Sequence, residues 1–182
     1  MLPLKTNRLL LRPFREADLE AFAAYRSDPE VARYQSWSTP YTLSQASAFL
    51  HEMQSVQAGA PGAWLQLAVE RLAQPGLIGD CAFQVLADDP MQAQIGFSFA
   101  QAYQKQGYAC EAVAALLDYL LTTLGLHRVS ATCDAENSAS ARLLERVGMR
   151  REGHMIENIW FKGGWGSEYF YAILQSEWQS PQ

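Results

Sequence analysis

The spacing of apolar residues predicts one long amphipathic helix in the second half of the chain. Apolar side chains recur there at intervals of three and four residues, at Ala109, Val113, Leu116, Leu117, Leu120 and Leu124. This interval matches the 3.6-residue period of an α-helix, so the six side chains share one face. Gly107 precedes the segment and Gly125 ends it. Because glycine is typical of helix ends, we expect a helix over residues 107–124.

Shorter runs of β-branched, aromatic and aliphatic residues predict strands, because they have strand lengths and are bounded by turn-forming residues. Such runs cover residues 9–11, 63–71, 77–86, 92–99, 128–133, 151–161 and 168–174. Further helices are expected over residues 16–25, 42–57 and 137–147. A capping box formed by Thr42 and Gln45 begins the second of these. The glycines at 163, 164 and 166 predict a hairpin tip between the last two strands.

The order of these elements, β-α-α-β-β-β-α-β-α-β-β, predicts a mixed α+β fold with helices packed against one sheet. A chain of 182 residues has the size of one domain. No internal repeat, linker or block of charge divides it. We therefore expect a single domain over residues 1–182.

Composition and charge exclude several classes of protein. Hydrophobic residues make up 49% of the chain and charged residues 18%, so the chain is neither disordered nor a solvated coiled coil. The net charge of −5 argues against nucleic-acid binding, which needs a basic surface. Three widely spaced cysteines without a CxxC pair fit a reducing compartment and predict no metal site. No segment approaches the roughly 18 apolar residues of a membrane helix, so we expect a cytoplasmic protein without membrane contact.

Residues 94–112 carry the clearest chemical signal. A predicted strand runs through a short loop into the long helix, and Gly107 lies at the helix start. The free backbone N–H groups and the positive dipole end of a helix N-terminus favour phosphate binding, and the small residues Gly107 and Ala109 allow close approach. The sequence has neither the GxGxxG of a dinucleotide site nor the GxxxxGK[ST] of a P-loop. A simple strand-to-helix turn therefore explains Gly107 equally well.

The segment Gln104-x-x-Gly107-x-Ala109 resembles the Q/R-x-x-G-x-G/A signature of the GNAT superfamily of acetyl-CoA-dependent N-acetyltransferases. Further blocks occur in the family's order and resemble its ribosomal-protein N-acetyltransferase branch. They are residues 6–13 (T-x-R-L-x-L-R-P), 95–97 with 107–112 (I-G-Y and G-Y-A-T-E-A), 137–140 with 144–149 (N-x-x-S and L-E-K-x-G-F) and 151–153 (R-E-G). The resemblance covers nearly the whole chain. It implies a mixed, mostly antiparallel sheet of seven strands flanked by about four helices.

The resemblance also implies an acetyl-CoA site between the strand over residues 92–99 and the following helix. In the family, two diverging strands leave a gap for the pantetheine arm, which Phe99 would hydrogen-bond through its backbone. The other residues implied to hold the arm or the pyrophosphate are Gln104, Gln106, Gly107, Tyr108, Ala109, Cys110 and Asn137. Asn137 is also suited to cap the helix that follows it.

Amine attack on a thioester needs a neutral nitrogen, a donor for the oxyanion and a proton for the departing thiolate. The resemblance implies that backbone N–H groups near residues 97–99 are the donor and that Ser140 protonates the thiolate. The alternative for Ser140 is a solvated serine at a helix start. Many relatives carry Glu at the position of Gln94 and Tyr at that of Leu144, and neither residue here transfers a proton. Candidate substitutes for the base are Glu157, Asp80, His154 or a water relay.

The missing base bears on the acceptor. At pH 7 an α-amino group with a pKa of about 7.8 is roughly 14% neutral, whereas a lysine amine with a pKa of about 10.4 is about 0.04% neutral. This difference of about 3.4 kcal/mol favours a low-pKa amine, such as a protein or peptide N-terminus. The alternatives are a specialised enzyme acting on an antibiotic or polyamine, and a non-catalytic acyl-CoA-binding or sensing module.

Aromatic residues in two loops are predicted to shape the acceptor pocket. Exposure of aromatic side chains to water is unfavourable, so their presence on loops indicates a binding surface. They are Tyr34, Trp37, Trp160 and Phe161, with Trp165 beside the last two. Core packing and a dimer interface are the alternatives. The oligomeric state stays open between a monomer and a homodimer.

Two further groups have more than one interpretation. Cys110 at the helix start would allow an acetyl-cysteine intermediate if the dipole lowered the pKa of its thiol, but a small residue beside the phosphates is the simpler explanation. The arginines at 142, 146, 150 and 151 either form a solvated face or lie near the 3′-phosphate of CoA.

Overall fold

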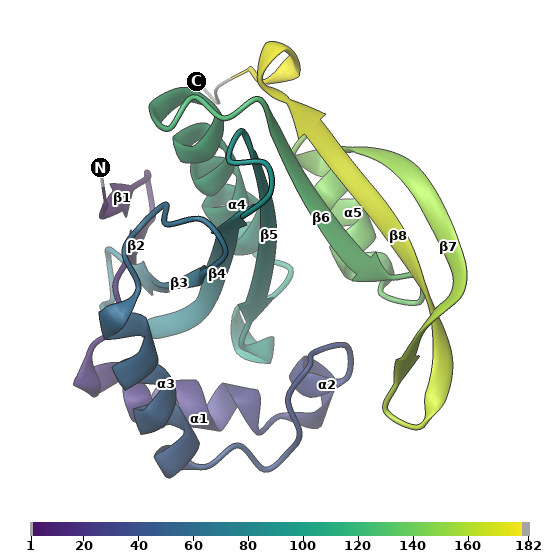
Figure 1. The fold of residues 1–182 in the computed structure, drawn as a ribbon. Helices are drawn as coiled ribbons and strands as arrows, with labels where there is room; N and C mark the ends of the chain where they lie inside the picture. The colour runs from purple at the N-terminus through teal and green to yellow at the C-terminus, as the bar shows by residue number, and fades with distance from the viewer. Residues whose placement is uncertain (1, 180–182) are drawn as a thin grey trace.

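The computed structural model describes residues 2–179 and contains one eight-stranded mixed sheet flanked by helices (Figure 1). The strands are β1 (Leu4–Lys5), β2 (Leu9–Arg12), β3 (Trp64–Arg71), β4 (Leu77–Val85), β5 (Gln92–Phe99), β6 (Arg128–Asp134), β7 (Arg150–Phe161) and β8 (Gly164–Leu174). They lie side by side in the order β1-β2-β3-β4-β5-β6-β8-β7. Strands β5 and β6 pair in parallel, and the other neighbouring strands pair antiparallel.

The helices follow the predicted pattern with one addition. They are α1 (Leu19–Arg26), α2 (Pro29–Ala32), α3 (Leu43–Ser55), α4 (Tyr108–Asp118) and α5 (Ser138–Arg146). The predicted long helix is thus α4 continued by a π-helical turn, Tyr119–Thr123. The predicted capping box begins α3, because Thr42 and Gln45 exchange side-chain to backbone hydrogen bonds.

The sheet separates two hydrophobic cores. The larger core joins the inward faces of β2 to β6 and β8 to the apolar face of α4 and to α5. Its residues include Leu116, Leu117 and Leu120, which the helical spacing places on the buried face. The smaller core lies on the other side, where α1 and α3 contribute Phe22, Ala46 and Leu50. Packing on both faces fixes the register of the central strands, because a one-residue slip would move every side chain to the opposite face and so into the wrong core.

Two details depart from the sequence prediction. The sheet has eight strands rather than seven, since the two-residue β1 pairs with β2 ahead of the first predicted strand. A short helix, α2, begins where the sequence indicated only the end of α1. Asp28 accepts a hydrogen bond from the backbone N–H of Glu30, and Pro29 occupies the first helical position. Asp and Pro therefore end one helix and begin the next, which is a common use of this pair.

The long antiparallel hairpin of β7 and β8 forms one end of the sheet, and its tip projects beyond the other strands (Figure 1). The tip lies between Phe161 and Gly164, within the predicted segment. Lys162 at the tip donates a hydrogen bond from Nζ to the carbonyl oxygen of Ala32, 2.6 Å away, and so connects the hairpin to α2. Within residues 2–179, no helix combines the length and the apolar character needed to span a membrane.

Candidate active site

The parallel strands β5 and β6 pair only along the first half of β5. Their register runs from Gln92 opposite Arg128 to Ile95 opposite Ala131, and residues 96–99 of β5 continue without a partner from β6. The backbone N–H of Ala100 donates to Ile78 on the β4 side. Because backbone groups alternate in direction along a strand, those of Phe97 and Phe99 point to the opposite side, toward β6. Hydrogen-bonding groups of β5 are therefore directed into the space where the strands separate.

A tight turn leads from the end of β5 into α4. Lys105 and Gly107 both have left-handed backbone conformations, with φ of 59° and 82°. Gln104 ties the turn to the strand by donating from Nε2 to the carbonyl oxygen of Phe99, 2.9 Å away. A turn with left-handed residues directs successive N–H groups into a concavity that favours anions. The turn thus continues the polar backbone edge of β5 toward the helix.

The N-terminus of α4 adds further N–H donors to this turn. Gly107 is the N-cap residue, and Glu111 is the first residue whose N–H bonds back to the Gly107 carbonyl. The N–H groups of residues 107–110 therefore have no acceptor within the helix. Together with the positive dipole end they form a site suited to a phosphate or pyrophosphate group.

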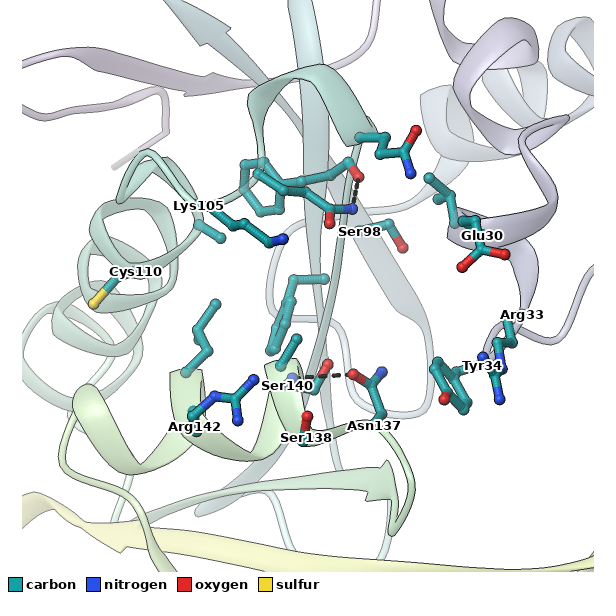
Figure 2. Close-up of a pocket in the computed structure, with 18 of the residues that line it drawn as sticks. Glu30, Arg33, Tyr34, Ser98, Lys105, Cys110, Asn137, Ser138, Ser140 and Arg142 are labelled. Atoms are coloured by element: carbon teal, nitrogen blue, oxygen red, sulfur yellow. Dashed lines mark hydrogen bonds between the residues drawn. The ribbon is translucent and has the colours of Figure 1, made fainter.

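A cavity of about 700 Å³ lies where the β5–β6 gap, the turn and α5 meet (Figure 2). The strand residues Phe97, Ser98 and Phe99 line one wall, and the first turns of α4 and α5 line others. The segment of α2 and the residues after it closes the far side. The volume is within the range of sites for small molecules and cofactors.

Most of the residues singled out from the sequence line this cavity. They are Tyr34, Phe99, Gln104, Gly107, Ala109, Cys110, Asn137 and Ser140. Gln106, Tyr108, Trp37, Trp160 and Phe161 are not among its lining residues. The expectation for Gln106 and Tyr108 concerned backbone N–H groups, and both residues belong to the turn and helix start that border the cavity.

The loop aromatics divide into three environments. The ring of Tyr34 lines the cavity, with the Arg33 guanidinium 5.0 Å from its centroid. Trp37 packs on the smaller core, where its indole N–H donates to the Arg26 carbonyl, as the core-packing alternative describes. Trp160 is 62% exposed at the end of the β7–β8 hairpin and makes an edge contact with Trp165 across the two strands.

Asn137 and Ser140 lie together at the start of α5, inside the cavity wall (Figure 2). The Oδ1 atom of Asn137 accepts a hydrogen bond of 3.1 Å from the backbone N–H of Ser140, so Asn137 is the N-cap of α5. The cap uses one oxygen of the Asn137 amide. Its NH₂ group and the hydroxyls of Ser138 and Ser140 are polar groups that this helix start offers to a bound molecule.

Charged side chains divide the cavity into two regions. Lys105, Arg142 and Arg146 line the side formed by the turn and α5, and Glu30 and Arg33 line the side formed by α2. Figure 2 shows Lys105 and Arg142 on the first side, and Glu30 and Arg33 on the second. Glu136 also lines the cavity and lies 3.7 Å from Arg33. The basic region favours the phosphates of a nucleotide, and Glu30 favours a cation at the opposite side.

Sequence reasoning selected Tyr34 but missed Glu30 and Arg33, which α2 and its C-terminal end contribute. Glu30, Arg33 and Tyr34 all line the cavity. They are spaced i, i+3 and i+4, which is the spacing of neighbours on one helix face. Asp28 and Pro29 are typical of a helix start, and this signal could have placed Glu30 on the same helix face as Tyr34.

The candidate bases named from the sequence lie outside the cavity wall. Asp80 is fully buried on β4, where its carboxylate accepts hydrogen bonds from Tyr25 and Gln66. Burial raises the pKa of Asp80, although the charge of Arg26 and these hydrogen bonds oppose the shift. His154 packs against Tyr169, and Glu157 lies exposed at a bulge of β7. Leu144, at the position where many relatives carry Tyr, is 1% exposed and belongs to the larger core.

Cys110 faces the cavity from the start of α4, but its thiol is not activated. Burial raises the pKa of Cys110, and the nearby charge of Arg146 only partly opposes this shift. The helix-start position therefore does not produce the low pKa typical of a nucleophilic cysteine. Among residues 2–179, no cluster of His, Cys, Asp or Glu is arranged to hold a metal ion.

A second groove of about 650 Å³ adjoins the first cavity. Both are lined by Gly107, Cys110 and Arg146, and the groove continues past Val147 and Gly148 to Trp178 near the end of β8. The two spaces therefore meet at the N-terminus of α4. A ligand longer than one cavity can extend from the β5–β6 gap past this helix start into the groove.

Comparison with known proteins decides the family. Residues 8–150 match the family model described as an acetyltransferase (GNAT) domain. The chain belongs to the GNAT acetyltransferase family. It is an N-acetyltransferase, and the mixed sheet with a V-shaped opening beside the helix start of α4 is the fold expected from the sequence motifs.

Relatives of this GNAT protein agree on the activity class and differ in the acceptor. It is 36% identical over 95% of its length to the uncharacterized N-acetyltransferase YnaD of Bacillus subtilis, covering 97% of that protein. A crystal structure of a GNAT-family acetyltransferase from Bacillus anthracis is 34% identical, with a TM-score of 0.85 over 97% of this chain and all of that one.

Two relatives that match only part of the chain have names that state their acceptors. The [ribosomal protein uS5]-alanine N-acetyltransferase of Escherichia coli is 30% identical over 46% of this chain and 43% of that protein. The spermidine N(1)-acetyltransferase of Vibrio cholerae is 29% identical over 58% of this chain and 61% of that protein. The superfamily prediction is therefore confirmed, whereas the ribosomal-protein branch is one of at least two branches that the relatives represent.

Proposed function

We propose that this protein transfers the acetyl group of acetyl-CoA to a primary amine by direct attack within a ternary complex. The observation that carries the proposal is the separation of β5 from β6 after Ile95 and Ala131, directly beside the uncapped N–H groups of α4. A free strand edge suits an extended amide-containing arm, and a helix start suits a pyrophosphate. Both lie on one cavity.

The residues present fit acetyl-CoA from one end to the other. The pantetheine arm would pair with the backbone of Phe99 along the free edge of β5. The pyrophosphate would accept hydrogen bonds from the N–H groups of Gln106 and Gly107 and from those of the first turn of α4. Lys105 and Arg142, which line this side of the cavity, supply positive charge for the phosphates. The adenosine would lie in the adjoining groove that Arg146 shares.

The reaction then uses groups of β5 and α5. When bound, acetyl-CoA supplies a thioester carbonyl that is open to attack by an amine. The backbone N–H of Phe97 points into the gap and would stabilise the negative charge that develops on the carbonyl oxygen, while the backbone of Phe99 holds the arm. As the N–C bond forms and the C–S bond breaks, the Ser140 hydroxyl would donate a proton to the departing thiolate and would take a proton back from solvent, so that the hydroxyl is regenerated. The amine nitrogen releases its proton to solvent.

Direct transfer is favoured over an acetyl-cysteine intermediate. Cys110 is the cysteine that lines the cavity, and burial raises the pKa of its thiol. A thiol with a raised pKa has a small thiolate fraction at neutral pH and is a weak nucleophile. We therefore expect the amine to attack acetyl-CoA directly, without prior transfer of the acetyl group to Cys110.

The acceptor that we propose is a low-pKa amine, with a protein or peptide α-amino group as the first candidate. Gln94 and Leu144 transfer no proton, and Asp80, His154 and Glu157 do not line the cavity. An acceptor that is already partly neutral at pH 7 is therefore used most efficiently. A small polyamine is the second candidate, because Glu30 and Glu136 place carboxylates on the acceptor side of the cavity.

Thiol release from acetyl-CoA tests this proposal. The purified protein would be assayed at pH 7 with peptides that carry a free N-terminus, N-terminally blocked peptides that carry lysine, polyamines and aminoglycosides. We expect faster release with free N-termini than with blocked lysine peptides. Faster acetylation of lysine side chains would contradict the acceptor class. CoA binding without thiol release from any acceptor would instead identify a non-catalytic acyl-CoA-binding module.

A further inference from the structure

The turn between β1 and β2 is fixed to the first turn of α4 through one carboxylate. Oε1 of Glu111 accepts hydrogen bonds from the Thr6 hydroxyl at 2.6 Å and from the backbone N–H of Arg8 at 2.9 Å. Oε2 accepts from Nε of Arg8 at 2.5 Å. Glu111 thus has three donors from a segment more than 100 positions earlier in the sequence.

The same arginine contacts the turn that precedes α4. Nη1 of Arg8 donates to the carbonyl oxygen of Gln106 at 3.1 Å, and its guanidinium carbon lies 4.6 Å from the centroid of the Tyr108 ring. Between these two residues, a Cβ added to Gly107 would lie 3.3 Å from Nη2. Arg8 therefore contacts Gln106 and Tyr108 and lies beside Gly107, at the position where the proposed pyrophosphate site begins.

The hydrogen bond to Gln106 has a consequence for the direction of the backbone. Holding the carbonyl of Gln106 toward Arg8 leaves the N–H of Gly107 to point the other way, because the two groups of one peptide unit are opposed. Gly107, which follows this peptide unit, and Lys105, which precedes Gln106, both have left-handed backbone conformations. The contact therefore helps to keep the N–H groups of the turn directed at a bound anion.

The ion pair also has an electrostatic consequence. Burial opposes ionisation of Glu111, but hydrogen bonds from Thr6 and Arg8 outweigh it, so the pKa of Glu111 is lowered and the residue is an anion at neutral pH. An anion in the first turn of α4 competes with a phosphate for the positive end of the helix. The guanidinium of Arg8 cancels this charge and holds the carboxylate against the β1–β2 turn.

We propose that Arg8 is a positioning residue for the phosphate end of acyl-CoA, which it prepares by orienting the 106–107 peptide unit and by neutralising Glu111. The inference rests on the proposed function, since it assumes that a pyrophosphate binds at the start of α4. It assigns a role to the first arginine of the 6–13 segment that is separate from that of the second. Arg12 pairs with Asp18 and Glu70 inside the protein and contributes to packing.

Binding and turnover of two acetyl donors test the inference. Acetyl-CoA carries the pyrophosphate, whereas S-acetylpantetheine carries the same thioester and arm without it. We expect Arg8→Gln to weaken CoA binding by about tenfold, a loss typical of removing a charged contact near a phosphate, and to change kcat/KM for S-acetylpantetheine by less than twofold. Arg8→Lys keeps the charge but loses the paired contacts to Gln106 and Glu111, and should lie between wild type and Arg8→Gln.

The charge relationship provides a second measurement. Glu111→Gln alone should change CoA affinity by less than twofold. This variant removes the negative charge of Glu111, and with it the need for Arg8 to neutralise that charge. The double variant Arg8→Gln/Glu111→Gln should recover at least threefold of the affinity lost in Arg8→Gln. Arg12→Lys is the matched control, since it should lower the thermal midpoint without a selective effect on acetyl-CoA.

Several results would overturn the inference. If Arg8→Gln affects both donors equally, or if the double variant binds CoA no better than Arg8→Gln, Arg8 has only a general structural role. Thermal unfolding of each variant identifies any that fail to fold, and Arg8→Lys then carries the comparison. If wild-type protein binds no CoA, the proposed function fails and this inference fails with it. If wild type and Arg8→Gln bind CoA equally, only the role of Arg8 is wrong.

Discussion

Ile95 of β5 and Ala131 of β6 are the last residues at which these two parallel strands face each other in register. Beyond this pair, β5 continues to Phe99 and the following turn into α4, while β6 continues to Asp134 and pairs only with β8. The separation exposes backbone donors of β5 next to the N-terminus of α4. A single break in strand pairing thus accounts for both the proposed arm site and its position beside the phosphate site.

Replacement of Gly107 tests the phosphate site. Gly107→Glu should abolish CoA binding, because a carboxylate at the helix start repels the pyrophosphate and fills the space it needs. Gly125→Glu is a matched control. Gly125 also has a positive φ, 68°, and lies beyond the opposite end of the α4 helical segment with no atom within 4 Å of an added Cβ. Calorimetric titration with CoA measures both variants. Equal loss of affinity in the two would mean that backbone strain, not the site, is responsible.

Ser140→Ala should lower kcat by about 100-fold without a matching change in KM for acetyl-CoA, because the variant removes a proton donor and leaves the cofactor contacts in place. Ser138→Ala is the control, since Ser138 lines the same cavity on the same helix turn. Its kcat should fall by less than threefold. Initial rates at saturating acceptor measure both. A similar decrease in the two variants would assign Ser140 to helix formation rather than to proton transfer.

Asn137 is expected to combine a cap with a contact to the pantetheine arm, and two substitutions separate these roles. Asn137→Ala should lower the free energy of unfolding by about 1 kcal/mol, as loss of an N-cap does. Asn137→Ser retains a capping oxygen and should be nearly as stable as wild type, yet raise KM for acetyl-CoA about fivefold through loss of the amide NH₂. Denaturant unfolding and steady-state kinetics give the two quantities. An unchanged KM in Asn137→Ser would mean that Asn137 acts only as the N-cap of α5.

The thiol of Cys110 gives a prediction about pH. Burial raises the pKa of Cys110 above that of a free cysteine thiol, so the thiolate, and with it the rate of alkylation by iodoacetamide, should stay low at pH 7 and increase only in alkaline solution. CoA should protect Cys110 but not Cys133, whose pKa is raised to about 11 and which does not line the cavity. Mass spectrometry of labelled peptides distinguishes the sites.

The same residue tests direct transfer. Cys110→Ser should retain kcat within about threefold of wild type, because the proposed mechanism uses no cysteine nucleophile. A loss of 100-fold or more, together with a trapped acetyl group on Cys110 of the wild-type protein, would replace direct transfer with a covalent route.

Glu30 is expected to contact the cationic part of the acceptor. Glu30→Gln should raise KM for a positively charged acceptor about tenfold, as loss of a charge-assisted hydrogen bond does, and leave KM for acetyl-CoA unchanged. Glu20→Gln is the matched control, because Glu20 is exposed on α1 and does not line the cavity. Kinetics over a range of ionic strength should show the difference shrinking as salt screens the charge. Equal KM values in the two variants would exclude Glu30 from acceptor binding.

Local sequence features predicted the local parts of the site. The capping box of Thr42 and Gln45, the cap at Asn137 and the helix start at Gly107 all depend on residues within a few positions of each other. The period of the apolar residues likewise gave the buried face of α4. The eighth strand was missed because β1 has only two residues, and α2 was missed because it has only four, too few to produce a hydrophobic period.

The sequence by itself therefore determined the longer helices and strands, the polar helix start and the family, because each follows from short-range backbone preferences and motifs. Only the tertiary structure decided that Arg8 meets Glu111, 103 positions away, and that Tyr34 and Glu30 face the cavity while Trp37 packs on the smaller core. It also decided that the sequence-selected bases lie outside that cavity. The physical reason is that strand pairing and the packing of helices on each sheet face bring distant segments together, and these contacts leave no periodic signal in the chain.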